Sequence, residues 1–323
     1  MADLLIISRD EVAAFLPYPA CVALMREAMI ALSLGRTRQH LRTILDLDGG
    51  RAFGVMPGAV DGAAFGAKLI SVFASADSPS HQGVVVLFDP ETGAPVAIVD
   101  ASELTAIRTA AASAAATEAL ARPDADRLAI LGTGEQALRH AEAIAAVRPL
   151  KGIAVWGRSP GKAEALAARL RAALGLEVRA EASARAAVAG AGIICTTTAA
   201  REPILLGDWV EDGAHLNIVG SSRAGPAEID GALVARARFF ADHREGVLSQ
   251  GAELLRAREA GLVGEDHLLG EIGQVFAGTL PGRTGPGDVT LYKSLGSVVQ
   301  DLAAGWHLYR LAVAGGFGTR VRF

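Results

Sequence analysis

The sequence predicts an α/β protein in which a doubly wound Rossmann domain is joined to an α+β domain. The chain has 323 residues, which is more than one hydrophobic core usually supports. Its first third contains short apolar runs separated by turn sequences, as is typical of antiparallel strands. From Arg127 onward, strand-like and helix-like segments alternate, which indicates a parallel sheet with both faces covered.

The first domain begins with two helices and continues with strands. Ser8 and Glu11 have the spacing of a capping box that opens a short helix, and Pro19 begins a second helix that runs to Gly35. The acidic turn DPETG is predicted to close a hairpin rather than to form a catalytic carboxylate pair. Five strand-like runs, rich in apolar and β-branched residues, are TRQHLRTILDL (37–47), RAFGVMPG (51–58), AAFGAKLISVF (63–73), QGVVVLFD (82–89) and APVAIVDA (94–101).

A helix of small side chains closes this domain. The stretch ELTAIRTAAASAAATEALA (103–121) holds one cation, Arg108, near its start. The helix dipole favours cations at the opposite end, and small-sided helix faces pack closely against neighbouring backbone. Arg108 therefore needs a partner, and we expect a carboxylate or a phosphate opposite its planar fork. The segment ARPDAD (121–126) is interpreted as the linker between the domains.

The second domain begins with a dinucleotide-binding fingerprint. The strand RLAIL (127–131) leads directly into GTGEQA (132–137), and a helix-forming run follows. This is the context that a GxGxxA fingerprint requires, and a glycine turn without a ligand is the alternative. Gly132 allows the tight turn, Gly134 lets a pyrophosphate approach the backbone, and Ala137 permits close packing of helix on strand. The helix N-terminus then faces the phosphates.

Further strands and helices continue the Rossmann pattern. GIAVW (152–156) is the second strand, SPGKAEALAARLRAAL (159–174) is its helix, and LEVRA, GIICTT, HLNIVG and RFFAD supply more strands. The segment VTLYKSLGSVVQDLAAGWHLYRLAVAG (289–315) is predicted to be a long amphipathic helix with no further strand beyond it. Besides the fingerprint residues, we assign these residues to cofactor binding: Glu135, Gln136, Thr196, Thr197, Val219, Gly220 and Ser221.

The end of the second Rossmann strand predicts which cofactor is used. NAD-selective folds commonly place an Asp or Glu there, about 20 residues past the glycines, to bind the ribose hydroxyls. This sequence has Gly157, Arg158 and Ser159 at that place, with Lys162 one turn further. Arg158 can pair with a 2′-phosphate, Ser159 can donate to it, and Lys162 adds charge. We therefore expect NADPH to be preferred and NADH to be possible; the alternative is a solvated loop whose cations touch nothing.

Composition and charge argue against several other functions. A net charge of −4 without a block of Lys or Arg indicates no nucleic-acid partner, so a small ligand is expected. No apolar run is long enough to span a membrane, and the N-terminus has no basic export signal. Cys21 and Cys195 are expected to be buried free thiols in a reducing compartment, which favours the cytoplasm. No metal-site spacing is present, and among the histidines only His81 is considered as a base, with a loop histidine as the more frequent situation.

Five separated motifs resemble those of one protein family. They are LTAIRTAAASAAAT, SHQGVVVLFDPETG, GTGEQA, REPILLGDWVEDGAHLNIVGSSR and DVTLYKSLGSVVQD, and together they resemble the ornithine cyclodeaminase and mu-crystallin family. The resemblance implies a homodimer formed through a substrate-binding first domain, residues 1–120. It further implies that a C-terminal helix over residues 294–323 folds back to complete that domain, and that residues 121–293 form the Rossmann domain.

The resemblance also implies roles for residues of the first domain. Members of the family act on α-amino or α-imino acids, and three cations hold the substrate carboxylate. By position these are Arg42, Lys68 and Arg108, and Thr109 binds beside the cofactor. Read without the resemblance, Arg42 could be an exposed strand residue and Lys68 a lysine whose stem lies along apolar surface. Lys68 is the best candidate for moving a proton.

One position bears on the reaction. Cyclodeaminases of this family have an aspartate just after the turn that ends the strand similar to HLNIVG, whereas this sequence has Ser222, and Glu228 lies too far along to substitute simply. In this feature the chain is similar to the ketimine reductase branch. The resemblance therefore implies an NAD(P)H-dependent reductase that transfers hydride to the C=N group of a cyclic or open-chain α-imino acid to give an L-amino acid. An amino-acid dehydrogenase, an ornithine or lysine cyclodeaminase and a non-catalytic, crystallin-like protein stay open.

Overall fold

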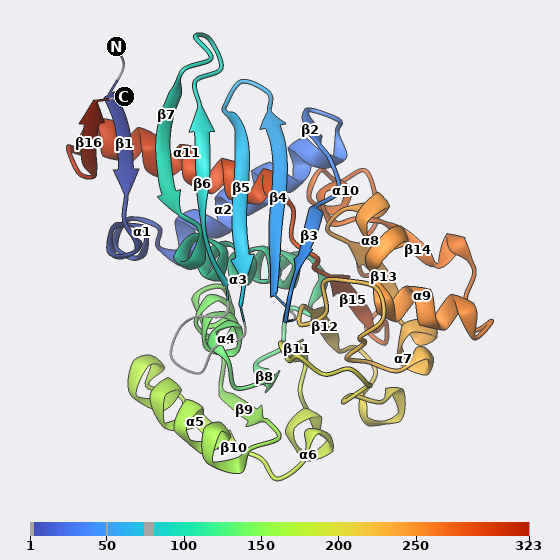
Figure 1. Cartoon of the computed structure of the whole chain (residues 1–323). Helices are drawn as coiled ribbons and strands as arrows, with labels where there is room; N and C mark the ends of the chain where they lie inside the picture. The colour runs from blue at the N-terminus through green and yellow to red at the C-terminus, as the bar shows by residue number, and fades with distance from the viewer. Residues whose placement is uncertain (1–2, 50, 74–80, 323) are drawn as a thin grey trace. The chain divides into compact units, whose positions relative to one another are not determined.

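The structure of the protein is a computed structural model that describes residues 3–49, 51–73 and 81–322 (Figure 1). Its internal contacts divide it into two compact units. The first unit comprises Met1–Arg108 and Ser297–Phe323, and the second comprises Thr109–Gly296. The first contains a mixed sheet, the second a parallel sheet, which confirms the predicted α/β class with one Rossmann domain.

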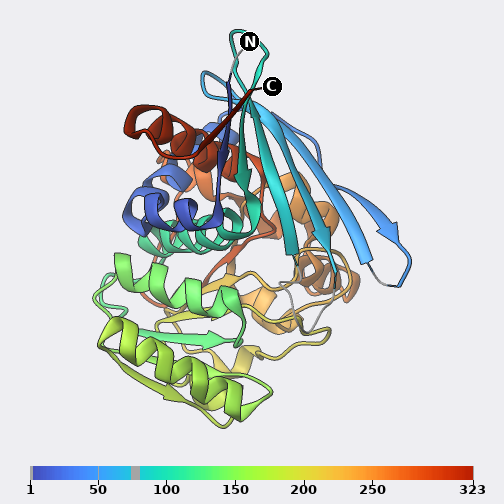
Figure 2. The ribbon, with the colours of Figure 1, turned by 60° about the vertical axis from the view of Figure 1, so that its left-hand side comes forward.

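The first unit is built on a sheet of eight strands. Their order is β16-β1-β7-β6-β5-β4-β2, with β3 paired to β4, and all neighbours are antiparallel except β1 and β7. The strands are β1 (Asp3–Ile7), β2 (Thr37–Gln39), β3 (Thr43–Leu47), β4 (Arg51–Val60), β5 (Phe65–Val72), β6 (His81–Phe88), β7 (Pro95–Asp100) and β16 (Thr319–Arg322). The helices are α1 (Arg9–Phe15), α2 (Tyr18–Ser33), the start of α3 (Ala101–Leu120) and α11 (Val298–Gly315). Helix α11 packs against α2 and strands β4 to β6, and no described helix of this unit covers the opposite face (Figure 2).

Side-chain alternation decides which strand residues meet the helices. Lys68 on β5 and Val85 on β6 are paired across the ladder and are both buried on the helix-covered face. At Gly58 on β4, an added Cβ would lie 2.6 Å from the Val298 side chain, so a glycine there allows α11 to approach the strand. Successive side chains point to opposite faces, so Leu69 lies on the uncovered face, where it is half-buried.

Most predicted elements of this unit are confirmed. Ser8 and Glu11 form the capping box of α1, and in the β6–β7 hairpin Asp89 Oδ1 accepts hydrogen bonds from two backbone N–H groups of the turn. The prediction of one strand over residues 37–47 is wrong, because residues 40–42 interrupt the run and leave β2 and β3, which both pair with β4. Strands β1 and β16 are not evident from the sequence, since segments of four or five residues carry little alternation.

The second unit contains eight parallel strands in the order β10-β9-β8-β11-β12-β15-β13-β14. The strands are β8 (Arg127–Leu131), β9 (Gly152–Trp156), β10 (Glu177–Ala180), β11 (Ile193–Thr196), β12 (His215–Ile218), β13 (Arg238–Ala241), β14 (Leu268–Glu271) and β15 (Thr290–Lys293). The helices are α4 (Glu135–Val147), α5 (Pro160–Leu174), α6 (Ala184–Val188), α7 (Gly231–Arg236), α8 (Arg244–Gln250), α9 (Ala252–Glu259) and α10 (Ile272–Phe276), with 3-10 turns at Gly207–Trp209 and Glu265–His267. The strand order reverses between β8 and β11, which makes the carboxyl ends of these strands the expected ligand edge.

The predicted long helix from residue 289 is wrong in its first part. Residues 290–293 form β15, which lies between β12 and β13 and is completely buried. The helix begins only at Val298, where the Ser297 side chain accepts a hydrogen bond from a backbone N–H. It ends at Gly315 and is followed by Gly316 in the left-handed conformation (φ 73°). A strand buried on both faces shows no alternation of apolar and polar residues, so nothing in TLYK distinguishes this strand from the start of the helix that follows.

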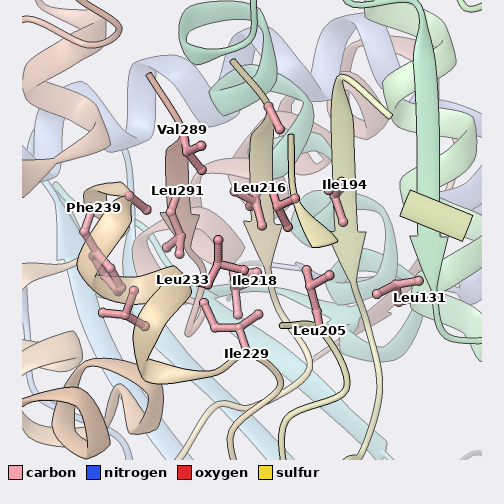
Figure 3. Close-up of a cluster of buried hydrophobic side chains, with 14 of the residues drawn as sticks. Leu131, Ile194, Leu205, Leu216, Ile218, Ile229, Leu233, Phe239, Val289 and Leu291 are labelled. Carbon is pink, nitrogen blue, oxygen red and sulfur yellow. The ribbon is translucent and has the colours of Figure 1, made fainter. Parts of the chain in front are cut away.

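The core of the second unit lies against the central parallel strands. Buried apolar side chains from several strands and α7 contact one another there (Figure 3). They include Leu131, Ile194, Leu216, Ile218, Leu233, Phe239 and Leu291. Packing against this shared core fixes the positions of the strands. The carboxyl ends of β8, β11, β12 and β15 therefore form a rigid edge of the sheet, from which the loops project.

Two further observations concern the described part of the chain. Cys21 and Cys195 are both buried and free, as predicted. Burial raises the pKa of each thiol to about 12, so neither is a ready thiolate. No single described helix is long and apolar enough to cross a membrane, although α1 and α2, joined by a 90° bend, meet that test as a pair.

Candidate active site

The first unit contains a buried charge cluster assembled from three distant segments. Lys68 comes from β5, Arg108 from α3 and Asp301 from the first turns of α11. Asp301 Oδ1 lies 2.8 Å from Arg108 Nε and 3.4 Å from Lys68 Nζ. The exposed fractions of the three residues are 4% or less, so the charges compensate one another away from bulk water.

Asp301 and Gln300 are the partners that Arg108 required. Arg108 Nε donates to Asp301 Oδ1, and Nη1 donates to Gln300 Oε1 at 2.7 Å. The Gln300 amide is itself fixed, because its Nε2 donates to Met29 Sδ at 3.1 Å. The Nη2 group of Arg108 makes no hydrogen bond with any described residue, which leaves that edge of the guanidinium able to receive a ligand.

Lys68 has an unusually acidic ammonium group. Burial lowers its pKa from the ordinary 10.5 to about 8; Asp301 opposes this effect, and the positive charges of Arg108 and Arg42 add to it. Its Nζ also donates to Thr105 Oγ1 at 2.6 Å. A pKa close to neutral suits a group that must both carry and release a proton.

Arg42 is the third of the cations that the family resemblance implies at the substrate site. It lies just before β3, is half-buried, and is close enough to Lys68 for its charge to lower the pKa of that ammonium. The structure therefore brings Arg42, Lys68 and Arg108 into one neighbourhood.

The sequence did not reveal the roles of Asp301 and Gln300, although both stand in the quoted motif GSVVQD. The available signal was a carboxylate and an amide in an otherwise apolar helix start. Asp301 Oδ2 is buried with no hydrogen-bond partner among the described residues.

In the second unit the fingerprint has the backbone that a pyrophosphate needs. Gly132 has φ +138°, and an added Cβ would lie 2.4 Å from Thr197 Oγ1, so only glycine fits this tight turn. Gly134 is the N-cap of α4, no side chain caps that helix, and no atom lies within 4 Å of its potential Cβ. Ala137 is completely buried. The open space and the uncapped helix N-terminus fit the phosphates of a dinucleotide.

The other proposed cofactor residues lie on neighbouring segments. Thr196 ends β11, Thr197 follows it with its N–H bonded to Leu131 O, and Val219 N–H donates to Thr196 O. The remaining predicted positions differ in exposure. Glu135 is exposed, Gln136 is half-buried and its Oε1 has no described hydrogen-bond partner, and Thr109 is buried on α3. Gly220 and Ser221 begin the loop after β12. All belong to the second unit.

Ser222 and its neighbours form a short loop whose start is fixed. Ser221 Oγ donates to the carbonyl groups of Arg223 and Pro226, and Lys293 Nζ donates to Ser221 O at 2.7 Å. Ser222 itself is half-buried. The structure thus places Ser222 at the carboxyl edge of the parallel sheet, as the strand HLNIVG suggested.

The loop after β9 presents the predicted phosphate-binding groups. Arg158, Ser159 and Lys162 are exposed, and Arg158 and Lys162 form no ion pair with any described residue. Ser159 is the N-cap of α5 and accepts a hydrogen bond from the Lys162 backbone. At Gly157 an added Cβ would lie 2.5 Å from Thr133 Cγ2, so the chain must pass close to the fingerprint turn here.

The two fully buried histidines, His140 and His215, have structural surroundings. His140 Nδ1 is hydrogen-bonded to Gln136 O and its Nε2 to Ser113 Oγ, and burial lowers its pKa to about 4. Burial likewise lowers the pKa of His215 to about 3. His81 begins β6, but its side chain lies outside the described residues. Within the described ranges, no group of three His, Cys, Asp or Glu side chains could hold a metal ion.

Comparison with known proteins identifies a family. The model of the ornithine cyclodeaminase/mu-crystallin family matches residues 3–316. The ketimine reductase mu-crystallin of Mus musculus is 38% identical over 282 residues, which cover 85% of each chain. A Delta(1)-pyrroline-2-carboxylate reductase of Bacillus cereus is 33% identical over 326 residues, covering 99% of this chain and 100% of that one.

A solved structure agrees over almost the whole length. It is the Thermococcus litoralis Delta(1)-pyrroline-2-carboxylate reductase in complex with NADH and L-proline. The two chains superpose with a TM-score of 0.95 at 30% sequence identity, covering 98% of this chain and 100% of that one. The similarity therefore includes the segments that carry the charge cluster and those that carry the fingerprint.

Proposed function

The chain belongs to the ornithine cyclodeaminase/mu-crystallin family, and from that premise we propose that it is an NAD(P)H-dependent reductase of α-imino acids. The reaction is hydride transfer to the C=N carbon of a cyclic or open-chain α-imino acid, which gives an L-amino acid. The observation that carries this proposal is the buried cluster of Lys68, Arg108 and Asp301, with Arg42 beside it. The relatives named as reductases of ketimines and of pyrroline-2-carboxylate support the same reaction class.

The residues of the cluster divide the work of binding and proton transfer. A bound NAD(P)H supplies the hydride. The free Nη2 edge of Arg108 binds the substrate carboxylate, and the charge of Arg42 adds to the attraction. Lys68, which is still mostly protonated at neutral pH, holds a proton for the imine nitrogen, and protonation makes the neighbouring carbon electrophilic. Asp301 keeps Lys68 and Arg108 in place, and Thr109 binds beside the cofactor.

The second unit is proposed to bind the cofactor. Gly132, Gly134 and the uncapped N-terminus of α4 would hold the pyrophosphate. Arg158 and Lys162, exposed and without ion pairs to described residues, would receive the 2′-phosphate of NADPH, and Ser159 would donate to it. The absence of an acid at residues 157–159 supports a preference for NADPH over NADH.

Ser222 supports reduction over cyclodeamination. In a cyclodeaminase a carboxylate helps to orient and deprotonate the attacking amine, whereas a serine hydroxyl can form a hydrogen bond but is not a base at neutral pH. The buried carboxylate of Glu228, which follows the loop that carries Ser222, already accepts four hydrogen bonds from described residues. The presence of all three cations together with the complete fingerprint supports an active enzyme over a non-catalytic binding protein.

We also propose that the protein is a homodimer formed through the first unit. The uncovered face of its sheet carries the apolar side chains of Phe53, Val55, Leu69, Val84 and Val86, all half-buried. A contiguous apolar face of this kind is typical of a protein–protein interface. A second copy of the same chain would cover it symmetrically.

A screen of substrates with both nicotinamide cofactors tests the proposed function. Oxidation of NADPH is followed with pyrroline-2-carboxylate, piperideine-2-carboxylate and open-chain α-imino acids, and ammonia release is followed with ornithine, lysine and alanine and the oxidised cofactor. We expect NADPH oxidation with at least one imino acid and little ammonia from any amino acid. Efficient conversion of ornithine to proline would instead establish cyclodeaminase activity, and inactivity across the panel despite cofactor binding would favour a binding protein.

A further inference from the structure

Glu228 occupies a buried position at the carboxyl edge of the parallel sheet. It follows the loop that carries Ser222, and its side chain is completely buried. Burial raises the pKa of this carboxyl, while hydrogen bonds from Thr196 and Thr198 and the charge of Lys293 oppose the rise. Burying a carboxylate costs free energy unless its oxygen atoms accept hydrogen bonds. The hydrogen bonds of Glu228 therefore make its buried position possible.

Four donors surround the Glu228 carboxylate. Oε1 accepts from the Thr198 N–H at 2.6 Å and from Thr198 Oγ1 at 2.8 Å. Oε2 accepts from Thr196 Oγ1 and from the Gly220 N–H, both at 2.7 Å. One side chain therefore connects the end of β11 and the residues just after it to the segment that follows β12.

The glycine at residue 220 belongs to the same contact. An added Cβ there would lie 2.1 Å from Thr198 O and 2.4 Å from Glu228 Oε1. The two segments consequently approach each other as closely as backbone allows, and Glu228 fills the space between them. Its own backbone is also held, since Glu228 O accepts from Ile204 and Leu205 and its N–H donates to Glu253 Oε1 at 3.2 Å.

A buried lysine secures the next residue of the loop. Lys293, at the end of β15, lies 2.8 Å from Glu253 Oε2 and donates to Ser221 O at 2.7 Å. Glu228, Glu253 and Lys293 thus connect the ends of three adjacent strands, β11, β12 and β15, through the loop that carries Ser222. In a doubly wound sheet the segments after these strands border the half of the dinucleotide site beyond the pyrophosphate.

We propose that Glu228 is a positioning residue for the nicotinamide half of the cofactor. It acts by holding the segments at residues 196–198 and 219–221 at a fixed separation, and it does not itself contact the fingerprint that receives the phosphates. This inference rests on the proposed use of a nicotinamide dinucleotide. It predicts that loss of the carboxylate weakens binding of the whole cofactor and leaves binding of its adenosine half unchanged.

Glu228→Gln tests this proposal, because the amide keeps the shape of the side chain but turns an NH₂ group toward two donors. Calorimetric titration compares NADPH with 2′,5′-ADP, which lacks the nicotinamide half. If the wild type binds NADH more tightly, NADH is compared with 5′-AMP in the same way. We expect the full cofactor to bind about tenfold more weakly to the variant, as the loss of one or more hydrogen bonds to a charged group implies. Binding of the fragment should stay within about twofold.

Two companion variants make the test decisive. Glu211→Gln is the matched control. The Glu211 carboxylate also accepts a hydrogen bond from a backbone N–H, that of Gly190 at 2.9 Å, but Glu211 precedes β12 instead of following it. The affinities for the whole cofactor and for the fragment should both stay unchanged in this variant. Thr198→Val removes one hydroxyl donor to Glu228, and with it the acceptor of the Ala200 N–H. If Glu228→Gln does not fold, this variant tests the proposal, and we expect a smaller loss of cofactor affinity with binding of the fragment unchanged.

The outcomes separate this inference from the proposed function. Unchanged cofactor affinity in Glu228→Gln, or equal weakening of cofactor and fragment, would overturn the positioning role. A wild-type protein that binds the cofactor but reduces no imino acid would overturn the proposed reaction while the binding comparison still stands. A wild-type protein that binds neither cofactor would overturn both.

Discussion

Arg108 and Asp301, 193 residues apart in the chain, are joined by a hydrogen bond of 2.8 Å between Nε and Oδ1. Both side chains are buried, and the bond leaves the Nη2 edge of the guanidinium without a described partner. Breaking one member of a buried ion pair is costly because the other charge remains without compensation. The pair therefore fixes the orientation in which Arg108 presents its remaining donors.

Replacement of Arg108 by lysine tests the carboxylate-binding role. Arg108→Lys keeps the charge but loses the planar fork, so it cannot bind Asp301, Gln300 and a substrate carboxylate together. We expect kcat/KM to fall at least tenfold, as loss of a charge-assisted pair of about 2 kcal/mol implies, with cofactor affinity largely intact. Arg36→Lys, at an exposed position of the same unit, is the control; an Arg108→Lys enzyme with unaltered kinetics would show that this arginine does not bind the substrate.

The pKa of Lys68 predicts the alkaline side of the pH profile. Burial depresses the pKa of the ammonium to about 8, so the group is protonated below that pH and loses its proton above it. If Lys68 supplies the proton, kcat/KM for imine reduction falls as the pH rises through about 8. Lys68→Arg should lower the rate and remove this limb, because a guanidinium does not titrate in the range. A limb that persists unchanged in Lys68→Arg would belong to another group.

Asp301 is expected to set the position of that limb. Its negative charge raises the pKa of Lys68 against the effect of burial, so Asp301→Asn should lower that pKa further. The alkaline limb of kcat/KM should move to lower pH, and KM should rise because Arg108 loses the partner that orients it. Rate profiles of wild type and variant on one imino acid measure both effects. A limb at the same pH in Asp301→Asn would contradict the electrostatic coupling of the two residues.

Arg158 is expected to determine cofactor preference. A charge-assisted contact with the 2′-phosphate contributes about 1.5–3 kcal/mol, which corresponds to roughly tenfold to a hundredfold preference for NADPH over NADH. Arg158→Ala should remove most of this preference and leave kcat/KM for NADH nearly unchanged, whereas Arg185→Ala, on helix α6, should change neither. Equal or better efficiency of the wild type with NADH would show that these side chains point elsewhere.

The uncovered sheet face predicts how the proposed dimer can be disrupted. Leu69 is half-buried on that face among other apolar side chains, so a charge there would be buried without a partner on association. We expect Leu69→Glu to give a monomer in light scattering at concentrations where the wild type is a dimer. Val313→Glu, at a 52% exposed position of α11 in the same unit, should remain dimeric. A dimeric Leu69→Glu protein would place the interface elsewhere.

Local patterns alone determined much of this protein. The capping box at Ser8, the DPETG hairpin and the strand–GTGEQA–helix succession depend on neighbouring residues, and all are present in the structure. The odd position of Arg108 in a small-sided helix likewise showed that the residue needed an acidic or phosphate partner. These features are readable because the interactions that create them span only a few positions in the chain.

Only the tertiary structure decided which residues complete the sites. Asp301 meets Lys68 across 233 positions and Glu228 meets Thr196 across 32, and no local pattern specifies which distant acid a cation or a hydroxyl will contact. The insertion of β15 between β12 and β13 has the same origin, since a strand buried on both faces loses the alternation that would identify it. Burial then changes the chemistry: a lysine with an ordinary pKa of 10.5 becomes one of about 8, because the fold removes water from around it.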